Sequence, residues 1–226
     1  MTDRIYNVAI DGPAGAGKST VARRAAAELG FVYVDTGAIY RAVALAVLDR
    51  KVDSTNEAAV ASLLKDTNVK LQWEQGVQHL LLNGVDVTDR LRSPEVSDAS
   101  SRVSAFSAVR RFLLETQREV ARQQSVIMDG RDIGTVVLPE AQVKIYLTAS
   151  AVTRAERRCK ELREKGLEAH YEDVLRDIEE RDYRDMHRAL APLRQAEDAV
   201  LLDTSALTLA QSIEETVRII REKLAL

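Results

Sequence analysis

The sequence has a single cysteine, Cys159, among its 226 residues. One cysteine excludes an intramolecular disulfide and a zinc site made of several cysteines, and it fits a reducing compartment. Long apolar runs are missing too: the longest, 42–48, is far shorter than the roughly 20 residues that a membrane helix needs. No signal peptide is expected, because the N-terminus leads directly into a strand-like stretch. We therefore expect a cytoplasmic protein that does not enter a membrane.

The chain also lacks an excess of charge of one sign. It has 32 Lys and Arg against 35 Asp and Glu, with a formal net charge of −3. Nonspecific binding of nucleic acid depends on clustered cations that neutralise phosphates. The balance therefore argues against nucleic acid as a partner, although it leaves room for a local basic pocket.

The apolar segments that are present alternate between strand-like and helix-like patterns. This alternation is typical of an α/β fold in which helices cover both faces of a parallel sheet. Gly30 is well placed to end the first helix. Strands are predicted over 5–10, 31–34, 126–128, 143–147 and 199–202, and helices over 21–29, 38–50 and 209–224.

Two stretches interrupt the alternation. In 52–100, short runs of alternating polarity are separated by Gln75-Gly76 and Asn83-Gly84. Since Asn-Gly is a strong hairpin signal, we expect a small antiparallel meander there. The second stretch, 151–190, is helical and highly charged, and its simplest interpretation is a solvated helical surface.

Residues 12–19 match the pattern G-x-x-x-x-G-K-[ST], directly after a predicted buried strand and at the start of a helix. Glycines let backbone N–H groups turn inward toward an anion, and the helix N-terminus adds positive charge. Lys18 would supply a charge for the β- and γ-phosphates and Ser19 a hydroxyl for Mg²⁺. The pattern predicts ATP with Mg²⁺; the alternative is a glycine turn without a ligand.

Polar residues follow the other predicted strands at the edge where parallel sheets bind ligands. Asp129 directly follows the predicted strand 126–128, at its carboxyl end, and we expect it near the Mg²⁺ ion or the waters bound to it. Arg131 and Asp132 follow directly, and they can meet a phosphate and an amino group. Asp35-Thr36-Gly37 precedes the next helix, with Thr36 predicted as its N-cap and Arg41 one turn further on.

Arg181, Asp185 and Arg188 have the spacing i, i+4, i+7, which places them on one helix face. Two interpretations stay open: an ion-pair ladder within the helix, or a lid that lays two guanidinium groups and a carboxylate over a nucleotide. Ser101 and Arg110 flank the start of a further helix, for which Ser107 is a candidate cap. These two residues alone are a weak signal.

Together these residues resemble the bacterial cytidylate (CMP) kinase family of nucleoside monophosphate kinases. The resemblance covers essentially the whole chain, including the meander. Thr36 departs from some family members, which carry Ser there, but it keeps the hydroxyl. The matching segments are 10–20, 35–41 (Asp-Thr-Gly-Ala-Ile-Tyr-Arg), 129–137 (Asp-Gly-Arg-Asp-Ile-Gly-Thr-Val-Val) and 181–193.

The resemblance implies a P-loop NTPase fold with a five-stranded parallel sheet flanked by helices. It further implies a core of about 1–36, 101–150 and 191–226, an inserted NMP-binding lobe of about 37–100, and a helical lid of about 151–190. The implied reaction is Mg²⁺-dependent phosphoryl transfer from ATP to CMP or dCMP. A monomer is expected, and the preference between CMP and dCMP stays open.

The site residues that the resemblance implies fall into four sets. ATP would be bound by Gly12, Pro13, Ala14, Gly15, Ala16, Gly17, Lys18, Ser19, Thr20, Arg154, Arg157 and Arg158. CMP would be bound by Thr36, Tyr40, Arg41, Ser101, Arg110, Arg131, Asp132, Arg181, Asp185 and Arg188. Lys18, Arg131 and Arg181 would stabilise the transition state, and Ser19 and Asp129 would hold Mg²⁺, with water as a further ligand. The alternatives are a P-loop kinase for another small acceptor and an NTP-hydrolysing switch or motor.

Overall fold

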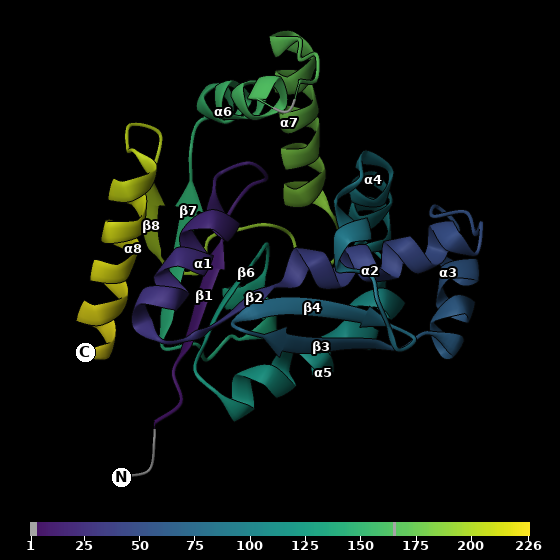
Figure 1. Ribbon diagram of the computed structural model, residues 1–226, viewed down its shortest axis with the longest axis horizontal. Coiled ribbons are helices and arrows are strands. Elements are labelled where there is room, and N and C mark those ends of the chain that lie inside the picture. Colours follow the sequence, from purple (N-terminus) through teal and green to yellow (C-terminus); the bar gives the residue numbers. More distant parts are fainter. Residues whose placement is uncertain (1–3, 165) are drawn as a thin grey trace. The chain divides into compact units, whose positions relative to one another are not determined.

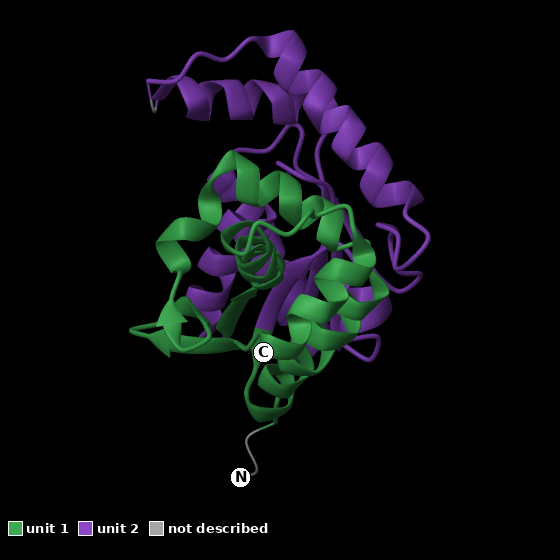
Figure 2. Ribbon diagram, turned by 90° about the vertical axis from the view of Figure 1, so that its right-hand side faces the viewer, with its two compact units in different colours: residues 1–5, 32–126 green, residues 6–31, 127–226 purple. Residues whose placement is uncertain are grey.

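The computed structural model describes residues 4–164 and 166–226. The chain divides into two compact units (Figure 2). Unit 1 holds Val32–Val126 with the described N-terminal residues up to Ile5, and unit 2 holds Tyr6–Phe31 and Ile127–Leu226. The division into core, lobe and lid stays a prediction. Residues 1–3 and Lys165, which it includes, lie outside the described residues.

The predicted five-stranded parallel sheet is confirmed among the described residues. Its strand order is β2-β6-β1-β7-β8. β1 pairs in parallel with β7, with Val8 opposite Val143, and β7 pairs in parallel with β8. The strands are β1 (Asn7–Asp11), β2 (Val32–Asp35), β6 (Val126–Gly130), β7 (Val143–Thr148) and β8 (Val200–Asp203).

The middle strands are apolar because both of their faces are covered. Val8, Ala9 and Ile10 on β1 are completely buried. The same is true of the run 126–128 on β6. Such continuous apolar runs are typical of parallel strands. In each strand the apolar run gives way to an aspartate, Asp11 or Asp129, and these aspartates lie at the carboxyl ends of the strands.

Unit 2 places helices around its strands. Figure 1 shows α8 beside α1 and β8, and α6 beside the upper part of α7. Gly30 ends α1 as predicted, because it takes the left-handed conformation with φ 69°. The helices are α1 (Lys18–Leu29), the π-helical turn η3 (Ile133–Val137), α6 (Ala151–Glu164), α7 (Tyr171–His187) and α8 (Leu209–Leu224).

Unit 1 contains the predicted meander, which is confirmed as a separate antiparallel sheet in the order β3-β4-β5. The sheet packs against α2, whose side chains are buried on nearly every face. The elements are α2 (Thr36–Asp49), α3 (Glu57–Leu63), η1 (Leu64–Asp66), β3 (Val69–Glu74), β4 (Val77–Leu82), β5 (Val85–Asp86), η2 (Thr88–Arg92), α4 (Pro94–Val103) and α5 (Ser107–Gln123).

Two predicted helix caps are wrong. Asp35, not Thr36, caps α2: its carboxylate accepts from the N–H of Ala38 at 2.8 Å, which makes Thr36 the first helical residue. At α5 the N-cap position is Phe106, and Ser107 is already helical. A side chain inside the first turn cannot reach the N–H groups that a cap residue bonds from outside it.

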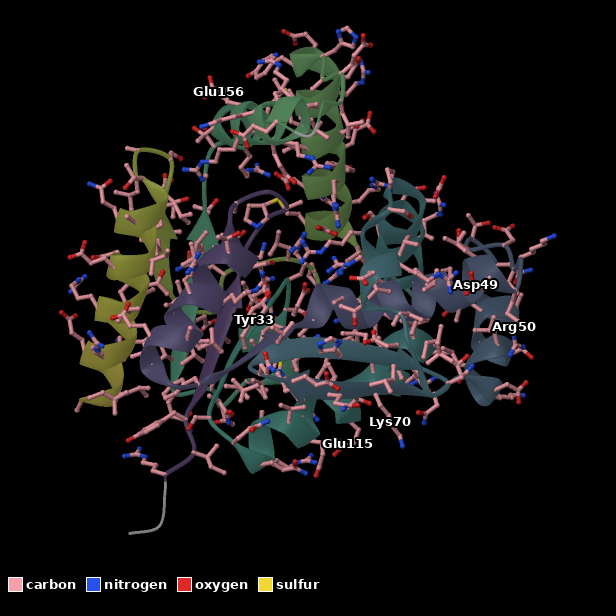
Figure 3. The ribbon with its side chains drawn as sticks, viewed as in Figure 1. Tyr33, Asp49, Arg50, Lys70, Glu115 and Glu156 are labelled. Atoms are coloured by element: carbon pink, nitrogen blue, oxygen red, sulfur yellow. The ribbon has the colours of Figure 1, made fainter. Side chains whose placement is uncertain are left out.

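Across residues 4–164 and 166–226, no helix combines the length and hydropathy needed to cross a bilayer. Charged side chains instead cover the outer faces of the helices. Glu156, for example, is exposed and projects outward from α6 (Figure 3).

Candidate active site

The loop between β1 and α1 is built to hold an anion. Gly17 occupies the N-cap position of α1 in the left-handed conformation, with φ 89°. Among the described residues, no side chain caps this helix. No described side chain therefore takes up the first N–H groups of α1, although the N–H of Thr20 donates to the Gly17 carbonyl at 3.1 Å. The helix dipole adds partial positive charge at the same point. This arrangement favours phosphate at the position that the motif predicted.

Lys18 is buried at the base of this loop, with 5% of its surface exposed. Its Nζ donates to the carbonyl of Pro13 at 2.7 Å. Burial and the nearby Arg131 charge lower the pKa of Lys18 to about 7, against the opposing attraction of Asp129 and Asp11. A phosphate would shift this balance, because it adds negative charge beside the ammonium group.

We expect the affinity for ATP to fall as the pH rises above about 7. Only protonated Lys18 attracts phosphate, and bound phosphate raises the lysine pKa above the value of about 7 in the free protein. Affinity is therefore complete below pH 7 and declines above it, with uptake of a proton on binding. Calorimetric titration in two buffers of different ionisation enthalpy measures that uptake. In Lys18→Arg, whose guanidinium stays charged, the uptake should vanish; a wild-type affinity independent of pH would contradict this prediction.

Ser19 and Asp129 come together as predicted for a metal site. The hydroxyl of Ser19 donates to Oδ2 of Asp129 at 2.8 Å, and Asp129 is buried. In the described part of the chain, no cluster of three or more His, Cys, Asp or Glu side chains could enclose a metal by itself. Mg²⁺ prefers oxygen ligands and keeps waters and substrate phosphates around it. One hydroxyl and one carboxylate therefore fit Mg²⁺ that is shared with a nucleotide.

Arg131 and Asp185 form a partly buried ion pair that joins the residue after β6 to α7. Nε of Arg131 lies 2.8 Å from Oδ2 of Asp185. Although burial favours neutral forms, the pair holds the pKa of Arg131 above its usual range and that of Asp185 below its usual range. The charges of Arg181 and Arg188 add to the effect on Asp185. Asp185 of α7 therefore faces the segment that follows β6, while Arg188 lies just beyond the end of the helix as its C-cap residue.

A second contact in unit 2 joins Arg188 to Asp132. Their side chains are less than a tenth exposed, and NH2 of Arg188 lies 3.4 Å from Oδ1 of Asp132. Arg188 also donates through Nε to the carbonyl of Ala191 at 2.7 Å. The structure thus brings together Arg131, Asp132, Asp185 and Arg188, which the sequence places in two distant segments.

The three predicted lid arginines on α6 have different surroundings. Arg154 is buried, donates to the loop carbonyl of Ala14 at 2.9 Å, and pairs with Asp182 of α7 at 2.5 Å. Arg157 donates to the carbonyl of Thr204 at 2.6 Å. Arg158 pairs with Glu161 on its own helix, where both side chains are about half exposed. Of the three, Arg154 has a direct contact with the phosphate-loop backbone.

Unit 1 positions the remaining predicted residues on three helices. Thr36 is buried in the first turn of α2, and Arg41 pairs with Asp35 at 3.0 Å. The guanidinium carbon of Arg110 lies 5.7 Å from the ring centroid of Tyr40. Arg110 also donates to the carbonyl of Ser104 at 3.1 Å. Ser101 lies on α4, and its carbonyl accepts from the Ser104 hydroxyl at 3.0 Å.

Sequence reasoning missed the part that aspartates play around these arginines. Asp35 and Asp182 hold Arg41 and Arg154, and Asp11 accepts hydrogen bonds from the backbone after β6. Burial raises the pKa of Asp11 to about 6, even though those two backbone N–H groups pull it down. A signal for Asp11 was present: an acidic residue that closes an apolar strand and directly precedes the glycine loop.

Comparisons with known proteins point in one direction. A family model described as cytidylate kinase matches residues 8–222. The cytidylate kinase of Lactobacillus johnsonii is 47% identical over 219 residues, which cover 97% of this chain and 95% of that protein. The cytidylate kinase of Carboxydothermus hydrogenoformans is 49% identical over 216 residues, 96% of this chain and 97% of that protein.

A solved structure supports the fold alone. An uncharacterized protein from Eubacterium ventriosum has a similar structure, with a TM-score of 0.52 and 11% sequence identity. The match covers 95% of this chain and 98% of that one.

Proposed function

Because this chain belongs to the cytidylate kinase family, we propose that it transfers the γ-phosphoryl group of ATP to CMP or dCMP. The observation that carries the proposal is the grouping in unit 2 of a buried phosphate-loop lysine, the Ser19–Asp129 pair and the Arg131–Asp185 pair. The first two serve a nucleotide triphosphate with its metal. In the Arg131–Asp185 pair, Arg131 would supply a fixed positive charge for the phosphate of the acceptor nucleotide.

In the proposed reaction a phosphate oxygen of CMP attacks the γ-phosphorus of ATP. The bond from that phosphorus to the β–γ bridging oxygen breaks in line, and ADP leaves as CDP forms. The attacking oxygen is already anionic, so the step needs no strong general base. Catalysis then consists of positioning and of charge stabilisation, for which we propose Lys18, Arg131 and Arg181.

We propose that residues 12–20 bind the ATP phosphates through their backbone N–H groups and Lys18. Arg154, Arg157 and Arg158 are proposed for the ATP base and phosphates, with the contact between Arg154 and the Ala14 carbonyl in support. Ser19 and Asp129 would hold Mg²⁺, directly or through water. When bound, Mg²⁺ would neutralise part of the phosphate charge.

For CMP we propose contributions from ten residues. Thr36, Tyr40, Arg41 and Arg131 would bind chiefly around its phosphate, and Ser101, Arg110 and Asp132 would recognise cytosine. Arg181, Asp185 and Arg188 would meet sugar and phosphate. Movement of α6 and α7 over bound nucleotides would exclude water and so suppress hydrolysis of ATP. We further propose that the protein is a monomer and works in the cytoplasm, where its substrates are found.

A coupled assay of ADP release with Mg²⁺-ATP and a panel of nucleoside monophosphates tests the proposed function. CMP and dCMP should be turned over well above AMP, GMP and UMP. Equal turnover of the other monophosphates would overturn the assignment of cytosine. Turnover of a non-nucleotide acceptor alone, or ATP hydrolysis stimulated by nucleic acid without CMP, would point to the alternative classes.

We expect Arg110→Ala and Asp132→Ala each to reduce the preference for CMP over UMP by about tenfold or more. Cytosine carries an amino donor where uracil carries a carbonyl acceptor, so a carboxylate beside that position favours cytosine. A site whose buried polar groups bond cytosine rejects uracil strongly, because uracil would leave those groups without a hydrogen-bond partner. Ratios of kcat/KM for the two nucleotides measure the effect. Arg111→Ala, an exposed neighbour on α5, is the matched control; an unchanged ratio in both test variants would remove these assignments.

A further inference from the structure

Asp11 joins the end of one strand to the segment that follows another. It is the last residue of β1, and 5% of its surface is exposed. Oδ1 accepts from the N–H of Ile133 and Oδ2 from the N–H of Gly134, both at 2.7 Å. One carboxylate thus satisfies two consecutive backbone donors from a segment more than 120 residues away.

These two donors are the first N–H groups of the turn η3. The first N–H groups of a helical turn have no partner inside it, and an aspartate at the N-cap position normally accepts from one of them. Asp132 is that N-cap residue, yet its side chain makes no cap hydrogen bond. Its carboxylate is directed instead toward Arg188. Asp11 therefore does the capping, and the Asp132 carboxylate is not used for it.

The turn is also held from its other side. A Cβ atom added to Gly134 would lie 3.1 Å from the side chain of Lys144 and 3.4 Å from Oδ2 of Asp11. Lys144 is itself held by Asp198 at 2.9 Å. The start of η3 therefore fits closely between the Lys144 stem and the Asp11 carboxylate, which leaves Asp132 little freedom to reorient.

We propose that Asp11 is a positioning residue for base recognition: by capping η3 from the neighbouring strand, it keeps the Asp132 carboxylate out of the cap and available to the cytosine amino group. This inference rests on the proposed function. Without Asp11, two buried N–H groups lose their acceptors, and the Asp132 side chain stands at the normal position to replace it. Capping and base recognition would then compete for the same carboxylate.

The central test is Asp11→Asn, which keeps the size of the side chain but replaces one acceptor oxygen with an NH2 group. We expect the KM for CMP to rise about 10- to 100-fold, the range that displacement of a binding group produces. The CMP/UMP ratio of kcat/KM should fall with it. The KM for ATP should rise far less, through the lost attraction between Asp11 and Lys18 alone. Equal rises in both KM values with an unchanged ratio would overturn the proposal.

The matched control is Asp203→Asn. Asp203 also ends a strand of the parallel sheet and accepts from a backbone N–H and a hydroxyl, both of Ser205, but it belongs to no proposed binding set. Its CMP/UMP ratio should stay at the wild-type value. A double variant, Asp11→Asn with Asp132→Asn, should show the ratio of Asp132→Asn alone, because Asp11 acts through Asp132. A further, additive loss would overturn that route.

Amide hydrogen exchange tests the cap without any substrate. The N–H groups of Ile133 and Gly134 should be protected in the wild type and in Asp132→Asn, and should lose protection in Asp11→Asn. Loss of protection in Asp132→Asn would overturn the proposal, even if Asp11→Asn failed to fold. A wild-type protein that does not phosphorylate CMP would refute the proposed function. The exchange of the Ile133 and Gly134 N–H groups would still show, independently, whether Asp11 caps η3.

Discussion

Lys18→Ala should lower kcat by about 10³-fold, the largest catalytic loss that we expect from a single side chain. The reason is geometric: the ammonium group lies inside the loop, fixed on the Pro13 carbonyl at 2.7 Å, where water does not weaken its charge. Charge that develops on the transferred phosphoryl group would lose this fixed partner. Single-turnover rates with saturating ATP and CMP measure the chemical step directly.

The fold should survive this substitution. Burying a charged lysine is costly, and relief of that cost offsets the loss of its hydrogen bond to Pro13. Lys70→Ala is the matched control, since Lys70 is exposed on β3 and projects into solvent (Figure 3). A Lys18→Ala enzyme within about tenfold of the wild-type kcat would show that other groups carry the transition-state charge.

Gly12→Ala should destabilise the protein by about 3 kcal/mol or more, through overpacking and backbone strain together. Gly12 has φ 152°, which L side chains rarely adopt. An added Cβ would lie 1.9 Å from the carbonyl oxygen of Leu147 and 3.4 Å from the Lys18 side chain. Because the obstacle is backbone of the buried strand β7, it cannot move aside. Unfolding in urea, followed by circular dichroism, gives the free energy of unfolding.

Gly76→Ala separates strain from collision. Gly76 lies between β3 and β4 with φ 79°, and an added Cβ would meet nothing within 4 Å. Its cost should therefore be about 1 kcal/mol, the price of the left-handed conformation alone. Similar losses for the two variants would mean that the approach of β7 to the loop does not restrict position 12.

Much of unit 2's chemistry could be predicted from the sequence, because it rests on local patterns. The glycine loop and the start of α1 are contiguous in the sequence. The change from an apolar run to Asp11 or Asp129 indicates where each strand reaches its carboxyl end. The spacing of Arg181, Asp185 and Arg188 predicted one helix face for all three, but α7 ends at His187 and Arg188 follows it in an extended conformation. Asp185 and Arg188 still contact residues that follow β6, through Arg131 and Asp132.

The partners of these side chains could not be predicted in the same way. Nothing local pairs Arg131 with a residue 54 positions away, or Asp11 with backbone groups beyond residue 130. The Asp11 contact depends on β1 and β6 lying side by side, and the Arg131 contact on where α7 packs. The misplaced cap of α2 has a different cause: Asp35 and Thr36 are adjacent and both suit an N-cap, and the path of the preceding strand decides between them.

Three arginines of unit 2 that are largely covered meet carboxylates within the folded chain: Arg131 with Asp185, Arg154 with Asp182, and Arg188 with Asp132. Much of the water around these guanidinium groups is therefore lost when the protein folds, although a fifth of the Arg131 side chain stays exposed. The dehydration penalty falls on the stability of the chain, once, and is not repeated each time a substrate arrives. A substrate phosphate bound as proposed would meet cations that are already oriented and largely dehydrated.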